Sequence, residues 1–386
     1  MSEGCRKDVA VALCYKDFAF WTGYSSVGLA VAAKKTAEEL NQHGIRTYVV
    51  GVKDNVELLQ SILFHNGKRA KEGKGPLTHC VIMAPWITPL DLKALVNYFP
   101  DMEFTVKSHC NVAALYGDYR GIGNFRQYAD LMNDLPNLSV SGNSRSFTQW
   151  FSEAYGVNTF LLPDLYSSRG HHEGKVRFSS QPLRLGAFGA LRPEKNIPSA
   201  VAAGLLIQNR LQVPVSFHIN QGGESEGKAI VNTIEQMSQA IPGFDVVKHR
   251  WMPWEKFSEL VRTMDLLFQP SFTESFNIVT ADGVVMGVPT VVSDAVRWAP
   301  KQWKANPDSP ENIANVGLHL LDDPRAWLDG KEALNEHNHK GLRLWKNYLY
   351  DEEPEEPVIP APEPVPEVEE PGWVSQLIQA VKDLWS

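Results

Sequence analysis

The feature that most constrains the fold of this chain is a repeated alternation of short apolar runs with longer segments that carry apolar residues at helical spacing. The runs 7–15 and 45–52, for example, flank one such helical segment. Nearly continuous apolar runs of this kind are typical of parallel strands that helices cover on both faces. The alternation extends through 1–163, stops in 164–182, where Ser, Gly, His and charged residues dominate, and then restarts. The sequence therefore predicts an α/β fold with two Rossmann-like parallel-sheet domains facing across a cleft, in which ligands bind beyond the carboxyl ends of the strands.

The C-terminal part of the chain departs from this alternation. Residues 351–371 contain nine acidic residues, seven prolines and no base, a composition typical of an extended, disordered segment. The last residues place Trp373, Leu377, Ile378 and Trp385 on one helical stripe, which predicts an amphipathic helix. Its single Lys and the acidic segment before it favour binding to a protein groove, in this chain or in a partner, over a membrane surface. We expect an N-terminal domain over 1–163, an interdomain linker over 164–182, a C-terminal domain over 183–310, helices over 311–350, an acidic Pro-rich disordered tether over 351–372 and a terminal amphipathic helix over 373–386.

Charge and cysteine content narrow the function classes. The nine acids of 351–371 more than account for the net charge of −8, so the rest of the chain carries +1 and does not by itself indicate a nucleic-acid partner. No apolar run approaches the ~18 residues of a membrane span, and the N-terminus has no signal-cleavage pattern, so we expect a cytoplasmic protein without a transmembrane segment. The four cysteines form no CxxC pair, which favours reduced thiols over a metal site.

The segment PSFTESFNIVTADGVVMGVPTVVSD, residues 270–294, places two acids around the start of a helix. Glu274 ends a predicted strand, and Asp282 follows eight residues later, roughly 12 Å along the helix. The unpaired amides of a helix N-terminus bind phosphate, whereas a carboxylate accepts hydrogen bonds from hydroxyl groups. A nucleotide sugar fits this pattern: its diphosphate would contact the amides of Ser275–Asn277, its sugar Glu274 and its ribose Asp282. The alternative from spacing alone is that Glu274 caps the helix and Asp282 is a solvated helix residue.

This segment resembles the donor-site signature of retaining GT-B glycosyltransferases of the family-four type. That signature is Pro-Ser-x-x-Glu, a small residue three positions later, a second acid, Gly-x-Pro, and a strand that ends in Ser-Asp. Asn277 stands where glycine is usual, and Asp282 stands where glutamate is usual. The resemblance is strong over 183–294 and weak over 1–165, and it implies that the N-terminal domain binds the acceptor and the C-terminal domain binds the donor. The matching residues are Pro270, Ser271, Glu274, Gly287, Pro289, Ser293 and Asp294.

A second segment, LGAFGALRPEKNI, is similar to the phosphate-binding segment of that family. Lys195 coincides with the family's lysine, while Arg192 supplies a guanidinium that many members carry two positions earlier, at Ala190 of this chain. His109 ends a strand where the family often has a histidine near the transferred sugar, and Gly23 lies where the family has a Gly-rich loop. The resemblance thus gives Glu274, Arg192, Lys195 and His109 as catalytic candidates, Gly23, Gly189, Ser275, Phe276, Asn277, Ile278 and Asp282 as donor-binding candidates, and no metal ligand.

The resemblance also implies a reaction. A sugar would move from a nucleotide-diphosphate sugar, for which we expect UDP, to an acceptor hydroxyl with retention and without a metal or other cofactor. The chain has no Asp-x-Asp pair of the kind typical of metal-dependent transferases, so Arg192 and Lys195 would stabilise the leaving diphosphate.

The sequence leaves the acceptor open between DNA and a carbohydrate, lipid or small molecule. The locally basic segments 68–74 and 169–177 are either solvated loops or contacts for the phosphates of a polyanionic acceptor such as DNA. Some enzymes of the resembled type glycosylate hydroxymethylated bases of phage DNA, which would place this protein in the host cytoplasm. The alternative function is a non-catalytic nucleotide-sugar-binding scaffold that recruits a partner through its C-terminal helix.

Overall fold

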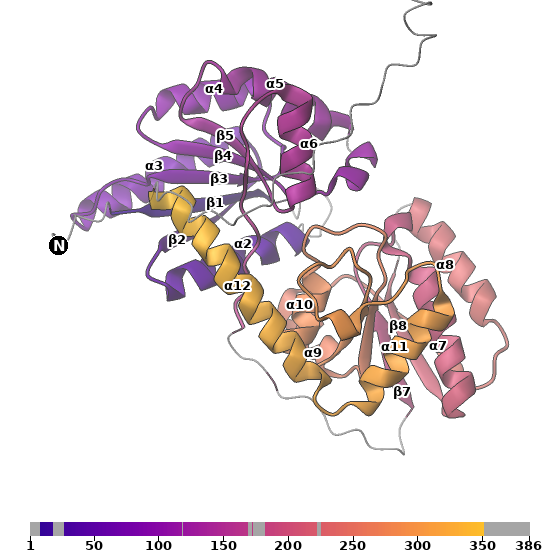
Figure 1. Cartoon of the computed structure of the whole chain (residues 1–386). Helices are drawn as coiled ribbons and strands as arrows, with labels where there is room; N and C mark the ends of the chain where they lie inside the picture. Colours follow the sequence, from indigo (N-terminus) through magenta and orange to yellow (C-terminus); the bar gives the residue numbers. More distant parts are fainter. Residues whose placement is uncertain are drawn as a thin grey trace, which may run out of the picture. The chain divides into compact units, whose positions relative to one another are not determined.

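The computed structural model describes residues 8–17, 27–117, 119–168, 172, 182–221 and 225–350. Within these ranges, no helix is long and apolar enough to cross a membrane. The described residues belong to one compact unit that contains two parallel β-sheets (Figure 1). We call the part around the first sheet the N-lobe and the part around the second sheet the C-lobe.

The N-lobe contains a six-stranded parallel sheet in the order β2-β1-β3-β4-β5-β6. The register pairs Ala10 with Arg46 between β1 and β2, and Val11 with His79 between β1 and β3. Its strands are β1 (Ala10–Lys16), β2 (Arg46–Val52), β3 (His79–Met83), β4 (Glu103–Ser108), β5 (Leu138–Gly142) and β6 (Phe160–Leu161). Its helices are α2 (Val27–Gln42), α3 (Asn55–Lys71), α4 (Pro89–Tyr98), α5 (Tyr119–Met132) and α6 (Arg145–Tyr155), with a 3₁₀ turn, η1 (Val112–Gly117), after β4.

The C-lobe contains a five-stranded parallel sheet in the order β11-β10-β7-β8-β9. The order places β7 directly beside β10, although about 80 residues separate them in the sequence. Its strands are β7 (Leu183–Ala187), β8 (Val215–Asn220), β9 (Phe244–His249), β10 (Leu266–Gln269) and β11 (Thr290–Val292). Its helices are α7 (Ile197–Leu211), α8 (Ser225–Ser238), α9 (Trp254–Arg262), α10 (Ile278–Val285) and α11 (Pro310–Asp322), with 3₁₀ turns η2 (Pro193–Lys195) and η3 (Lys301–Trp303).

Burial of both sheet faces explains why the strands are apolar throughout. In β1, Ala10, Ala12 and Cys14 belong to one hydrophobic cluster, whereas Val11 and Leu13 belong to another. Successive side chains of a strand point to opposite faces, so each face of this sheet has its own core. The parallel sheets covered on both faces that the sequence predicts are therefore confirmed.

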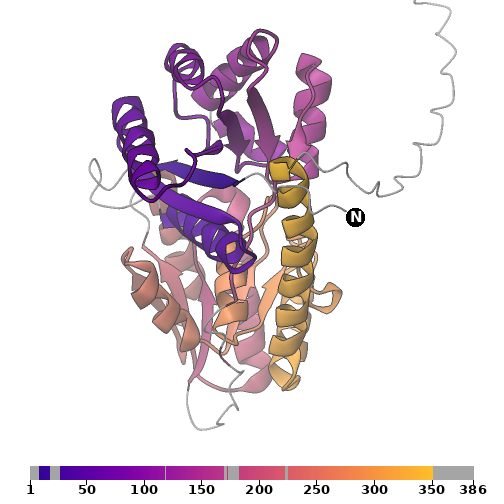
Figure 2. The same ribbon diagram turned by 90° about the vertical axis from the view of Figure 1, so that its left-hand side faces the viewer.

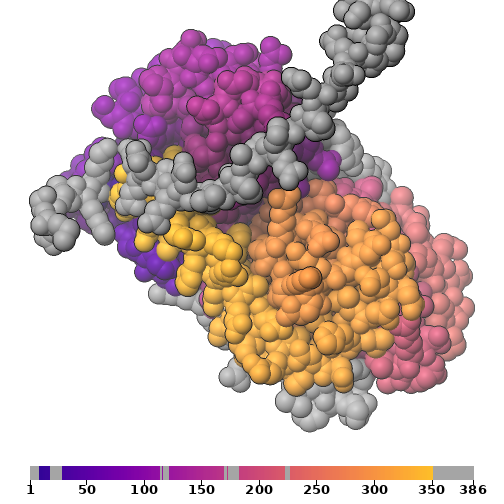
Figure 3. Space-filling view, viewed as in Figure 1, coloured from indigo at the N-terminus to yellow at the C-terminus, as the bar shows by residue number. Residues whose placement is uncertain are grey.

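The long helix α12 (Ala326–Tyr350) packs against both lobes (Figures 1 and 2). Leu334 belongs to the C-lobe core, whereas Leu342 and Trp345 belong to the N-lobe cluster around Val11. The Trp345 indole Nε1 donates a hydrogen bond to the Pro163 carbonyl at 2.8 Å. In the space-filling view the yellow surface of α12 borders both the purple N-lobe and the orange C-lobe (Figure 3).

The segment predicted as a linker over 164–182 begins with buried residues. Asp164, Leu165, Tyr166 and Ser167 are each at most 2% exposed, and Asn338 of α12 hydrogen-bonds both the amide and the carbonyl of Tyr166. The helices expected over 311–350 are α11 and α12. Most of the remaining linker, the acidic tether and the terminal helix lie outside the described residues.

Candidate functional site

Glu274 and Lys195 form an ion pair where two neighbouring strands end. Glu274 lies in the loop between β10 and α10, and Lys195 lies in η2 after β7. The Lys195 Nζ is 2.7 Å from the Glu274 Oε1, and their side chains are 23% and 7% exposed. Because β7 and β10 are adjacent parallel strands, their carboxyl ends meet at one edge of the sheet. The two residues that the sequence motifs single out are thus in direct contact.

Asn277 positions the Glu274 carboxylate and starts α10. Its Nδ2 donates hydrogen bonds to the Glu274 Oε1 at 2.8 Å and to the Gln269 Oε1 at 2.9 Å, and its Oδ1 accepts one from the Thr280 amide at 2.8 Å. The backbone φ of Asn277 is 69°, a left-handed conformation that glycine adopts easily and asparagine tolerates better than other residues. This conformation explains why asparagine can replace the glycine that is usual at this position of the resembled signature.

Two polar side chains at strand ends hold the loop after β7. The Gln269 Nε2, at the end of β10, donates to the Phe188 carbonyl at 2.8 Å, and the Asn220 Oδ1, at the end of β8, accepts from the Gly189 amide at 2.7 Å. Gly189 has a φ of 118°, which strongly favours glycine. Sequence analysis missed Gln269 and Asn220, although each is a buried amide side chain at the end of an apolar strand.

The three residues directly before α10 offer backbone N–H groups as hydrogen-bond donors. No described residue accepts a hydrogen bond from the amides of Ser275, Phe276 or Asn277. The Ser275 Oγ donates to the His109 carbonyl at 2.7 Å, and the Phe276 ring stacks on Trp298 with centroids 5.5 Å apart. Ile278, also a donor-site candidate, is partly buried and packs against both cores. Its side chain therefore belongs to the packing between the lobes, while the preceding amides form a candidate anion site.

His109 belongs to a buried polar network centred on Asp164. The His109 Nδ1 is 3.2 Å from the Asp164 Oδ2, the Asn143 Nδ2 donates to the same oxygen at 2.7 Å, and the Lys107 Nζ bonds the Asp164 Oδ1. Burial alone would raise the pKa of Asp164, but its interactions with His109 and Lys107 outweigh this effect and hold the pKa well below its usual range. An ionised Asp164 favours a proton on the His109 Nδ1.

The other ring nitrogen of His109 is available for a ligand. The His109 Nε2 is buried, and no described residue hydrogen-bonds to it. With its proton on Nδ1, a neutral His109 presents a lone pair on Nε2 and can accept a hydrogen bond from a hydroxyl group. Sequence analysis missed Lys107 and Asp164 as its partners, because it placed Asp164 at the start of the linker.

Hydrogen bonds between the lobes bring the two halves of the candidate site together. The Asn111 Nδ2 donates to the Glu274 carbonyl at 3.2 Å, and Ser275 contacts both the His109 carbonyl and the Asn143 side chain. The loop after β4 of the N-lobe therefore contacts the loop after β10 of the C-lobe. This contact places His109, Ser275, Glu274 and Lys195 in one region.

Asp282 has an environment different from the one the sequence predicts. Its side chain is buried, and its Oδ1 accepts hydrogen bonds from the Tyr166 hydroxyl and, at 2.8 Å, from the Trp254 Nε1. Burial raises the pKa of Asp282 to about 6 from 3.8, although both hydrogen bonds oppose the rise. Asp282 is therefore not a solvated helix residue, and its predicted contact with a ribose stays a prediction.

The remaining candidates lie at the surface or outside the described residues. The Arg192 side chain is 60% exposed and lies 3.9 Å from the Glu194 carboxylate. Gly23 lies outside the described residues. Among the residues that are described, no group of three or more His, Cys, Asp or Glu side chains could hold a metal ion.

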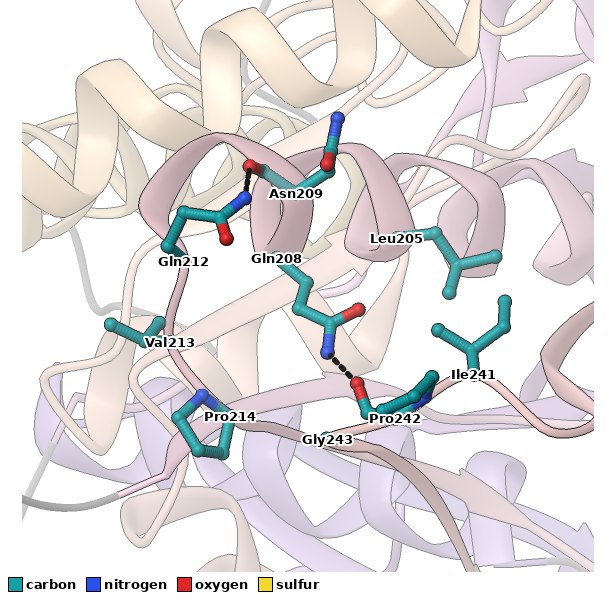
Figure 4. A pocket seen from close by; sticks show the side chains of 9 residues that line it. All are labelled: Leu205, Gln208, Asn209, Gln212, Val213, Pro214, Ile241, Pro242 and Gly243. Carbon is teal, nitrogen blue, oxygen red and sulfur yellow. Dashed lines mark hydrogen bonds between the residues drawn. The ribbon is translucent and has the colours of Figure 1, made fainter.

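Two cavities differ in their relation to these residues. One of about 600 Å³ lies at the amino ends of β8 and β9, where Gln208 and Pro242 are joined by a hydrogen bond of 2.8 Å (Figure 4). Its lining contains no titratable side chain, and it lies at the opposite strand ends from Glu274. A second cavity, of about 540 Å³, includes Glu274 and Ser275 in its wall.

Comparison with known proteins connects this architecture to solved structures. No model of a protein family and no curated protein matches the chain. Sucrose-phosphate synthase from Thermosynechococcus elongatus is similar with a TM-score of 0.59 at 12% identity, over 88% of this chain and 98% of that one. A trehalose-6-phosphate structure from E. coli, bound with UDP-2-fluoro glucose, is similar with a TM-score of 0.55 at 8% identity, over 89% and 97% of the two chains.

TarM of S. aureus, solved in complex with UDP among other ligands, is similar with a TM-score of 0.51 at 14% identity. The match covers 71% of this chain, which spans about 55% of the length of TarM. At these identities the likeness concerns the fold, and the two parallel sheets of six and five strands match those of GT-B glycosyltransferase structures. The chain therefore has the GT-B fold.

Proposed function

We propose that this protein is a nucleotide-sugar-dependent glycosyltransferase that transfers a sugar to an acceptor hydroxyl with retention and without a metal ion. The observation that carries the proposal is the ion pair of Lys195 and Glu274, at 2.7 Å, beside amides of the α10 N-terminus that no described residue uses. A cation and helix amides suit a diphosphate, and an adjacent fixed carboxylate suits sugar hydroxyls. Two structures of similar fold that were solved with UDP or a UDP-sugar support UDP as the nucleotide.

Each residue has a definite task in this proposal. Glu274, held by Asn277, accepts hydrogen bonds from hydroxyls of the transferred sugar. Lys195, with Arg192, stabilises the negative charge that grows on the diphosphate as the sugar bond breaks. The His109 Nε2 accepts a hydrogen bond from a further sugar hydroxyl and thereby fixes the orientation of the ring.

The proposal keeps Asp282 at the ribose end of the donor. No described residue donates a hydrogen bond to its Oδ2, whereas its Oδ1 already accepts from Tyr166 and Trp254. A ribose hydroxyl would therefore bond Oδ2, or replace the Tyr166 hydroxyl on Oδ1. Because Asp282 is 2% exposed, this contact requires Tyr166 or Trp254 to move when the donor binds.

The experiment that tests the catalytic proposal compares two ion pairs of the C-lobe. Glu274→Ala and Lys195→Ala should each lower the turnover of a UDP-sugar by about 100-fold or more, the usual effect of removing a group that stabilises a transition state. Glu235→Ala and Lys248→Ala break an ion pair whose two side chains are 46% and 41% exposed and should leave turnover unchanged. The measurement is the rate of donor hydrolysis, monitored through the release of UDP.

The outcome also separates catalysis from mere binding. If Glu274→Ala and Lys195→Ala turn over the donor like the wild type, the site assignment is wrong. If the wild type binds UDP-sugars without any turnover in the presence of acceptors, the non-catalytic scaffold replaces the enzyme as the function.

For the acceptor, we propose DNA with hydroxymethylated bases as the most specific candidate. The basic segment 68–74 supports this less than its sequence suggests, because Arg69 is 1% exposed and bonds Asp8, while Lys74 pairs with Glu72. The other basic segment, 169–177, lies outside the described residues except for His172. Incubation of a donor panel with hydroxymethylated DNA, plain DNA and simple glycans, followed by mass spectrometry, identifies the acceptor. Transfer to a glycan and not to the modified DNA would contradict the DNA proposal.

A further inference from the structure

The cavity of about 540 Å³ beside Glu274 is lined by cations from three parts of the chain. Arg145 begins α6 in the N-lobe, Arg297 and Lys301 follow β11 in the C-lobe, and Lys340 lies on α12. The volume falls in the range of pockets that bind small molecules, roughly 300–1,000 Å³.

Three of these cations have no anionic partner among the described residues. Lys340 pairs with Glu336 on the same helix, and the other acid of the wall, Glu274, pairs with Lys195. Within the described part of the chain, no carboxylate forms an ion pair with Arg145, Arg297 or Lys301. Cations that share one concave wall repel each other and concentrate a positive potential in the cavity. An anion bound there removes this repulsion.

The shape and chemistry of the wall indicate which anion fits. Two guanidinium groups and an ammonium suit the several oxygens of a phosphate group, and the start of α6 adds a partial positive charge. Trp298, Pro163 and Pro300 supply an apolar part of the lining, against which a ring or a short carbon chain can pack. We propose that this cavity binds a phosphomonoester, with its dianionic phosphate held by Arg145, Arg297 and Lys301 and its organic part against Trp298.

The position of the cavity couples it to the candidate donor site. Asn143 and Ser144 of its wall belong to the hydrogen bonds between the lobes, since Asn143 bonds Ser275 and Ser144 bonds Asn111, which in turn bonds the Glu274 carbonyl. A phosphate held by Arg145 of the N-lobe and Arg297 of the C-lobe stabilises this same contact. The phosphomonoester and the nucleotide therefore strengthen each other's binding, and by thermodynamic linkage the factor is equal in both directions. This coupling depends on the proposed function, whereas phosphomonoester binding does not.

Isothermal titration calorimetry with phenyl phosphate tests the binding, with phenol as the uncharged control and sodium chloride holding the ionic strength fixed. The full-length wild type should bind phenyl phosphate and not phenol. The double variant Arg297→Gln/Lys301→Gln should bind it about 10-fold or more weakly, because it loses two charge-assisted contacts. The variant Lys93→Gln/Arg262→Gln removes the same charge from exposed positions outside the cavity and should bind like the wild type.

Three results would overturn the proposal. The first is that the wild type does not bind phenyl phosphate, and the second is that it binds phenol equally well. The third is that both double variants lose the same affinity for phenyl phosphate, which would indicate non-specific attraction to net charge. All substituted side chains are exposed, so each variant should unfold at the wild-type temperature, which a thermal melt checks.

A second probe distinguishes an acceptor from an effector. Phenyl phosphate has no free hydroxyl and can act only as an effector, whereas glycerol 3-phosphate has two and can also accept a sugar. As an acceptor, glycerol 3-phosphate gains a hexose when its hydroxyl oxygen bonds the anomeric carbon, the sugar–diphosphate bond breaks and the hydroxyl proton leaves with the nucleotide. Mass spectrometry detects that product, which assigns the cavity to the acceptor.

Tighter UDP binding in the presence of either probe, without such a product, assigns the cavity to an effector. UDP binding that no phosphomonoester changes overturns the coupling and leaves the anion site intact. Failure of UDP to bind at all overturns the proposed function instead.

Discussion

At the scale of single residues, Glu274 and Asp282 show how position decides the chemistry of two similar side chains. Glu274 bonds a cation, Lys195, and accepts a hydrogen bond from the side-chain amide of Asn277. Asp282 lies deeper and bonds only neutral donors, Tyr166 and Trp254. The first carboxylate is therefore oriented beside a cation, whereas burial raises the pKa of the second to about 6.

The raised pKa of Asp282 predicts a specific pH dependence of stability. The usual pKa of an aspartate is 3.8, and that of Asp282 in the folded state is about 6. Between these two pH values, the folded state therefore holds a proton that the unfolded state has lost. The contribution of this group is thus fully present below pH 3.8 and is lost, by about 3 kcal/mol, as the pH rises through 6.

The variant Asp282→Asn tests this dependence, because an amide does not titrate and its oxygen can still accept from Tyr166 and Trp254. Its free energy of unfolding in urea should fall less between about pH 4 and pH 7 than that of the wild type. Asp245→Asn, at an exposed position on β9, serves as the control and should keep the wild-type slope. Identical slopes for Asp282→Asn and the wild type would refute the assigned pKa.

At the scale of elements, the start of α10 combines a helix cap with the orientation of Glu274. Asn277 is the residue before the helix, and Gly283 within the helix lets it lie close to the sheet, since a Cβ there would be 2.8 Å from the Leu267 Cδ1. The amides before α10 and the Glu274 carboxylate therefore keep a fixed relation to β10. Both properties depend on the left-handed backbone at Asn277.

Substitutions of Asn277 test whether the left-handed backbone conformation at this position affects stability. Asn277→Ala should destabilise the protein by about 2–3 kcal/mol, because it combines left-handed strain with loss of the cap. Asn277→Gly should cost about 1 kcal/mol or less, since glycine relieves the strain. At the exposed helical position Glu332 the order should reverse, with Glu332→Gly less stable than Glu332→Ala by about 1 kcal/mol. Chemical denaturation gives the free energy of unfolding of all four variants. An Asn277→Ala variant that is more stable than Asn277→Gly would contradict the argument.

The alternation of strands and helices along the chain was accessible from the sequence, and so was the assignment of Glu274 and Lys195 to one ligand, but their direct ion pair and the supporting residues were not. Apolar runs indicate burial directly, and both motifs follow predicted strands, which places both at the carboxyl edge of one parallel sheet. The roles of Gln269 and Asn220 depend on which strands are neighbours, and the order β10-β7-β8 is not encoded in any local pattern. Asp164 escaped notice because its polar neighbours resemble a linker, although its partners Lys107 and Asn143 lie on or just after β4 and β5.

At the scale of the whole molecule, α12 joins the cores of the two lobes. Trp345 is fully buried in the N-lobe cluster, and Leu334 is fully buried in the C-lobe cluster. The helix also contributes His337, whose Nε2 bonds the Asp164 carbonyl at 2.8 Å, so it reaches the network around His109. The stability of both lobes therefore depends on one helix.

Trp345→Ala should lower the free energy of unfolding by about 3–5 kcal/mol, the usual loss for a large side chain in a core. Trp345→Phe keeps most of the packing but leaves the Pro163 carbonyl without its donor, which should cost about 1–3 kcal/mol. Trp251, which is 38% exposed, provides the control, and Trp251→Ala should change stability by at most about 0.5 kcal/mol. Urea denaturation followed by circular dichroism gives the three values, and a Trp345→Ala variant as stable as Trp251→Ala would show that α12 contributes little.

The double anchoring of α12 limits the motions by which a substrate can enter. Leu334 and Trp345 are fixed in different lobes and lie roughly 16 Å apart along a rigid rod, since a helix rises 1.5 Å per residue. The two lobes cannot separate along the axis of α12 unless Leu334 or Trp345 leaves the core in which it is buried. For the donor of the proposed function, this anchoring favours access by a rotation of the two lobes about α12 over a separation of the lobes along its axis.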